Sequence, residues 1–101
     1  MMLEVGKLYS CSKYFLLLIN ANDARRTHHV RLTAEDCGLA VSYWIRELGN
    51  PVSFCEPLTP LLVLSMTKKK TYIEVLVGDK RGWFVNDGWL EFKEIVEDYE
   101  D

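Results

Sequence analysis

The sequence predicts a mainly β fold with one inserted α-helix at about residues 34–48. Short runs of strand-forming residues, separated by turn residues, fill the last third of the chain, a pattern typical of a small antiparallel barrel or sandwich. A stretch in the middle instead has apolar residues at helical spacing. With 101 residues, of which 49% are hydrophobic, the chain has the size and composition of one domain with its own core.

The first expected element is a strand from about Lys7 to Ile19, bent near Ser12. Its Tyr, Phe and Ile residues favour extended structure. Residues 20–23 (Asn-Ala-Asn-Asp) then carry turn-forming side chains. The basic residues 25–31 show no clear periodicity, so we expect a loop or an edge strand there.

The central helix has signals at both ends. Thr33 can act as the N-cap, and Asp36 then lies near the positive end of the helix dipole. Gly49 suits the left-handed residue that follows a helix. The expected buried face comprises Leu39, Ala40, Tyr43, Trp44 and Leu48. Because Gly38 costs a helix about 1 kcal/mol relative to Ala, a strand through Val41 to Ile45 is the alternative.

The last third predicts four short strands separated by polar or glycine-containing turns. A short extended piece at residues 52–55 precedes them. Since Pro60 has no N–H to donate, the hydrogen-bonded part of the first of the four can begin only after it. The expected strands are residues 60–66, 71–77, 82–85 and 89–93. Gly82 would allow the close approach of a neighbouring strand at a barrel corner.

Residues 60–93 resemble the C-terminal half of a Src-homology-3-like barrel, in particular the bacterial variety. The resemblance rests on Leu62-Val63-Leu64, Tyr72-Ile73-Glu74-Val75-Leu76, Gly82-Trp83-Phe84 and Trp89-Leu90. It implies a Src-homology-3-like β-barrel in which the helix at 34–48 is an insertion. It also implies that Tyr72 and Trp83 occupy positions that often line the binding groove of such barrels.

Charge is distributed unevenly along the chain. The net charge is −3, but residues 87–101 carry seven acids and one base, which leaves +3 on residues 1–86. We therefore expect a single domain over residues 1–95 followed by an acidic tail at 96–101, whose simplest role is solubility.

No pattern for a catalytic, metal or cofactor site is evident. The sequence has no nucleophile elbow and no Gly-rich phosphate loop. The adjacent His28 and His29 lack the paired spacing of zinc ligands. Three cysteines cannot all pair within one chain, and they are expected to be reduced thiols: Cys11, Cys37 and Cys55. We therefore expect a protein that is not an enzyme and that needs no cofactor or metal.

A cytoplasmic location is expected from two further observations. The longest apolar run, Phe15 to Ile19, is far shorter than the ~20 residues of a membrane helix. The start of the sequence also lacks the pattern of a secretory signal.

The resulting functional hypothesis is a non-enzymatic protein–protein interaction module. Its partner is another protein or a second copy of the chain, and no small-molecule substrate is indicated. Aromatic side chains would supply buried area, and acidic side chains would steer a basic partner. The predicted partner-binding residues are Tyr72, Glu74, Trp83, Asp87 and Trp89.

Two alternatives remain open. The chain could be a small phage-type or accessory inhibitor that occludes a host enzyme or a defence protein. It could also be a small nucleic-acid-binding barrel, although the negative net charge argues against this. The residues that would make basic contacts are Arg25, Arg26, His28, His29, Lys68, Lys69 and Lys70.

Overall fold

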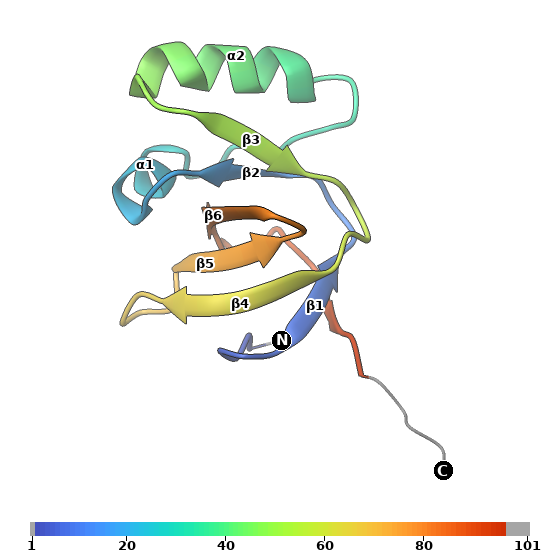
Figure 1. Cartoon of the computed structure of the whole chain (residues 1–101). Helices are drawn as coiled ribbons and strands as arrows, with labels where there is room; N and C mark the ends of the chain where they lie inside the picture. Colours follow the sequence, from blue (N-terminus) through green and yellow to red (C-terminus); the bar gives the residue numbers. More distant parts are fainter. Residues whose placement is uncertain (1, 97–101) are drawn as a thin grey trace.

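The computed structural model describes residues 2–96 and shows a curled antiparallel sheet that forms a half-barrel (Figure 1). Among these residues the sheet has seven strands in the order β3-β2-β6-β5-β4-β1-β7. The strands are β1 (Leu8–Cys11), β2 (Phe15–Leu18), β3 (Val52–Cys55), β4 (Leu61–Met66), β5 (Tyr72–Val77), β6 (Lys80–Val85) and β7 (Phe92–Glu94). Two helices, α1 (Ala21–Arg26) and α2 (Cys37–Leu48), complete the fold. The predicted mainly β fold is confirmed.

The prediction of a single strand over residues 7–19 is wrong, because the chain forms two strands there. β1 pairs with β4 and β7, whereas β2 pairs with β3 and β6. Every residue of β2 is buried: Phe15 and Leu17 belong to one hydrophobic cluster, Leu16 and Leu18 to another. A continuous apolar run is typical of such a strand, covered on both faces.

Helix α1 replaces the turn predicted at residues 20–23 and the start of the loop or edge strand predicted at 25–31, whereas residues 27–31 form a loop as predicted. The side chain of Asn20 accepts a hydrogen bond from the N–H of Asp23 at 2.8 Å, which caps the helix. Asp23 is itself buried, and its carboxylate accepts a hydrogen bond from the Asn50 amide at 2.8 Å. This bond joins α1 to the turn between α2 and β3.

The inserted helix is confirmed, although it begins at Cys37 rather than at residue 34. Asp36 occupies the N-cap position without a side-chain cap, and Thr33 donates its hydroxyl hydrogen to the Asp36 carboxylate. Gly49 adopts the predicted left-handed conformation, with a φ of 70°. The buried face differs from the prediction, because the outward-facing Leu39 and Tyr43 are 76% and 48% exposed.

Strands β4, β5 and β6 form the predicted antiparallel meander. β6 begins at Lys80, two residues earlier than predicted, because it pairs with β5 up to the two-residue turn at 78–79. Gly82 packs closely against β2: a Cβ there would lie 3.0 Å from the Cβ of Leu17. The last predicted strand, 89–93, is replaced by the shorter β7, which begins at Phe92, ends at Glu94 and pairs with β1.

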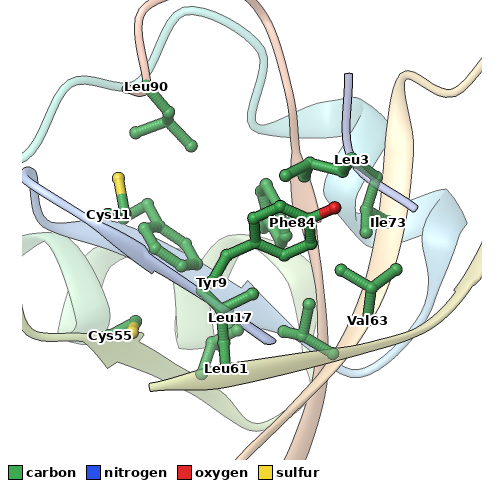
Figure 2. Close-up of a cluster of buried hydrophobic side chains, with 12 residues drawn as sticks. Leu3, Tyr9, Cys11, Leu17, Cys55, Leu61, Val63, Ile73, Phe84 and Leu90 are labelled. Carbon is green, nitrogen blue, oxygen red and sulfur yellow. The ribbon is translucent and has the colours of Figure 1, made fainter. Parts of the chain in front are cut away.

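The concave side of the sheet encloses one of two hydrophobic clusters (Figure 2). Tyr9 is fully buried there, and its hydroxyl oxygen accepts a hydrogen bond from the N–H of Glu4 at 2.9 Å. The ring centroids of Phe15 and Phe84 lie 4.8 Å apart. The second cluster fills the space between the other face of the sheet and the helices.

The helices and the C-terminal segment bear on two further predictions. Within the described residues, neither helix is long and apolar enough to cross a membrane. Of the predicted acidic tail at 96–101, Val96 is exposed and residues 97–101 lie outside the described part of the chain.

Candidate binding surface

One predicted aromatic residue and several predicted basic residues lie near the start of β5. Tyr72 lies directly opposite Val85 in the sheet. Val85 in turn lines a small cavity together with Thr27 and Trp89. The fold thus brings Val85, the partner of Tyr72 in the sheet, to the same cavity as Thr27 at the end of α1 and Trp89, although these residues are far apart in the sequence.

A hydrogen bond between His28 and Tyr72 joins the two basic segments of the chain. The His28 Nε2 atom lies 2.8 Å from the Tyr72 hydroxyl oxygen. The two rings meet edge to face, with centroids 5.4 Å apart. Tyr72 follows directly after the turn that carries Lys68, Lys69 and Lys70, so this contact connects the segment at 25–31 with the lysine turn.

The lysine turn and Tyr72 border a surface hollow of about 410 Å³. Its lining residues are Thr67, Lys68, Lys69, Thr71 and Tyr72. Two hydrogen bonds fix the base of the turn: the Thr67 N–H donates to the Tyr72 carbonyl, and the Tyr72 N–H donates to the Thr67 hydroxyl. The Lys70 ammonium points elsewhere, since it lies 3.2 Å from the sulfur of Met2.

Trp89 is held between cations rather than presented as a free ring. The Lys13 ammonium lies 3.3 Å from the centre of the ring, and the Arg31 guanidinium carbon lies 4.4 Å from it. Both are cation–π contacts. The Asp87 carboxylate accepts a hydrogen bond from the backbone N–H of Trp89 at 3.1 Å. Asp87 therefore shapes the turn that positions Trp89.

Glu74 and Trp83, the two remaining predicted partner-binding residues, lie directly opposite each other on β5 and β6. The Glu74 carboxylate accepts hydrogen bonds from the Ser65 hydroxyl and from the Arg81 guanidinium, both at 2.9 Å. Trp83 is half-buried and packs against the cluster beneath the helices. Both side chains thus make contacts within the chain, and Glu74 forms an ion pair with Arg81.

The cations near Tyr72 and Trp89 form no ion pair with an acidic side chain within residues 2–96. Residues 24–32 and 64–73 contain no Asp or Glu. The ion pairs found among residues 2–96 involve Lys7 and Arg81 as cations. We use the name basic surface for Lys13, His28, His29, Arg31, Lys68, Lys69, Tyr72 and Trp89. Arg25 and Arg26 are exposed in the last turn of α1, immediately before it.

A second feature is the outer face of α2, which we define as Leu39, Tyr43 and Arg46. Leu39 and Tyr43 are one helical turn apart, so their side chains are neighbours. The sequence analysis placed both on the buried face. The exposed Arg46, three residues after Tyr43, shares their side of the helix and is the signal that could have identified it as the solvent side.

The thiols are not arranged for chemistry. Cys11, Cys37 and Cys55 are all buried and free. Burial raises the pKa of each thiol, and that of Cys55 reaches about 11. No group of three or more His, Cys, Asp or Glu side chains within residues 2–96 is placed to hold a metal ion.

No protein-family model matches the chain, and neither curated proteins nor solved structures give a significant match. Function is therefore inferred from the geometry and charge of the described residues.

Proposed function

We propose that the chain is a non-enzymatic interaction module that binds another protein through the outer face of α2. The observation that carries this proposal is the pair Leu39 and Tyr43, 76% and 48% exposed and adjacent on one helix. Burying such a pair in an interface removes apolar area from water, and Tyr is among the residues that contribute most to protein interfaces.

The helix is well supported for this role. Its opposite side packs through Val41, Trp44 and Leu48 onto the cluster above β2 and β3. Gly49 ends it with a backbone hydrogen bond to Ile45. A face held in this way loses little conformational entropy on binding. Arg46 at its border favours a partner that offers an apolar groove with an acidic rim, the helix-in-groove mode of recognition.

A Src-homology-3-like relationship of residues 60–93 is part of the proposal. It is supported by the curled sheet and by the β4–β5–β6 meander. In that case α2 is an insertion that brings its own binding face. Of the two groove positions implied by the resemblance, Trp83 has less support as a contact residue, because it packs inward.

Affinity capture with paired variants tests the proposal. The variant Leu39→Ser with Tyr43→Ser removes the apolar pair, and Val5→Ser removes a comparable apolar side chain, 57% exposed, outside α2. We expect the unmodified chain and Val5→Ser to retain the same partner, and the double variant to lose it. Because all three positions are exposed, thermal melting should remain cooperative in each.

Retention of the same partner by the double variant would contradict the proposal. The identity of the captured protein then separates the two protein-binding hypotheses. A single enzyme whose activity falls when the chain is added is the result expected for an inhibitor. Several unrelated partners are the result expected for a general interaction module.

A further inference from the structure

We propose that the basic surface is a second binding site, which takes single-stranded nucleic acid with one base stacked in the hollow beside Tyr72. This site is separate from the outer face of α2 and does not depend on the function proposed for it. It rests on three features of the structure: unpaired charge, an aromatic ring next to a hollow, and a hydrogen bond that fixes their relative positions.

The charge of this surface matches a phosphate backbone. Lys68 and Lys69 border the hollow, and Arg31 lies farther along the surface beside Trp89. None of these three forms an ion pair with an acidic residue in the described range. Cations left without partners gain from phosphate contacts, since binding releases the counterions of the nucleic acid. The net charge of −3 thus conceals a local positive field.

The hollow supplies what a nucleobase needs. Tyr72 forms one side of it, and the lysine turn and Thr71 form the rest. Bases stack on aromatic side chains largely independently of sequence, while nearby cations follow the backbone. A base paired within a duplex is not available for this contact, so the site favours single strands.

The His28–Tyr72 bond sets the direction of the strand. It places the segment at 27–31 beside β5, and Figure 1 shows α1 at the same end of the sheet as the β4–β5 turn. A strand leaving the hollow passes His28 and His29 and reaches Arg31 and Trp89. The Arg31 and Lys13 side chains stacked on Trp89 would meet the next phosphates.

An acidic protein segment is the competing ligand, and two features favour nucleic acid over it. The aromatic residue Tyr72 lines the hollow, and an aromatic side chain stacks a flat base better than it binds a carboxylate. The cations are also spread along a path from the lysine turn to Arg31 rather than gathered at one point, as a repeating phosphate chain requires.

Fluorescence anisotropy with a labelled oligothymidylate of about 12 nucleotides tests the inference, since single-strand sites commonly span up to ~16 nucleotides. We expect binding at about 50 mM salt that weakens as salt rises, with a linear dependence of log K on log salt. A duplex of equal length should bind more weakly. A polyglutamate peptide of similar charge should compete poorly.

Variants separate stacking from charge. Tyr72→Ala should weaken binding by about 5- to 100-fold, the range for loss of one stacked base, whereas Tyr72→Phe keeps the ring and most of the affinity. Lys68→Gln with Lys69→Gln should weaken binding about tenfold and reduce the salt slope. The matched control is Lys80→Gln with Lys93→Gln, two exposed lysines outside the basic surface, which should bind as the unmodified chain does.

Three results would overturn the inference. The first is no binding of the oligonucleotide at about 50 mM salt. The second is equal loss of affinity in the lysine control pair and in the pair that borders the hollow. The third is tighter binding of polyglutamate, which would assign the surface to an acidic protein. Because Lys68 and Lys69 are exposed, their variant should fold and remains informative even if Tyr72→Ala does not.

Discussion

At the scale of single residues, burial explains why the three cysteines are chemically quiet. Cys11 and Cys55 lie in the interior cluster of the half-barrel, 1% exposed. Loss of solvation there disfavours the thiolate, and the pKa of Cys55 rises from 9.0 to about 11. Reduced thiols were expected from the sequence, and their burial, which raises the pKa of each, is a physical reason for low nucleophilicity.

This residue-scale property predicts a pH dependence of stability. The folded-state pKa of Cys55 is raised above the unfolded value of 9.0. Its contribution to the free energy of unfolding is therefore fully present below pH 9 and is lost as pH rises toward 11. Urea unfolding should therefore show a falling free energy over this range. Cys55→Ala should show a shallower fall. An identical slope in both proteins would show that other groups cause it.

At the scale of elements, two predictions failed for the same physical reason. Asn20 and Asp23 favour turns and helix N-caps alike, so the local pattern did not separate a turn from α1. Leu39 and Tyr43 are apolar at helical spacing, yet β2 and β3 accept only the side of α2 that carries Trp44. In both cases tertiary packing decided between structures that the sequence allowed.

The sequence was most informative where a residue type strongly favours one conformation. Gly49 ends α2 in the left-handed conformation, as predicted. The late strands are short runs of strand-forming residues that end at turns, so β4, β5 and β6 were predicted to within about two residues. Of the candidate site, the sequence analysis named Tyr72, Trp89 and basic residues at 25–31 and 68–70, but neither Lys13 nor the His28–Tyr72 bond, because that contact joins residues 44 positions apart.

Two glycine substitutions test the packing of these elements in opposite directions. Gly82→Ala places a Cβ 3.0 Å from that of Leu17, between β6 and β2, and should lower the free energy of unfolding by about 1–3 kcal/mol. Gly38→Ala meets no atom within 4 Å and should stabilise α2 by about 0.5–1 kcal/mol. Denaturant titration of both variants measures the difference. Equal effects would contradict the close contact of β6 with β2.

At the scale of the whole molecule, the fold separates a packing framework from two surfaces with different chemistry. The curled sheet holds the interior cluster, and the helices cover its other face. The outer face of α2 offers apolar side chains, whereas the basic surface offers cations and an aromatic ring beside a hollow. Leu39 and Tyr43 of α2 and Lys68 and Lys69 of the basic surface are exposed, so these positions can be changed while the fold is retained, whereas Tyr72 and Trp89 also pack against the hydrophobic clusters.

Site-specific photo-crosslinking in cells that express the protein tests the proposed interface of the molecule most directly. A photoreactive phenylalanine analogue replaces Leu39 in one variant and Val5 in another, both exposed positions. We predict that position 39 captures a discrete protein on irradiation and that position 5 does not. Crosslinks to the same protein from both positions, or none from position 39, would contradict binding through the outer face of α2.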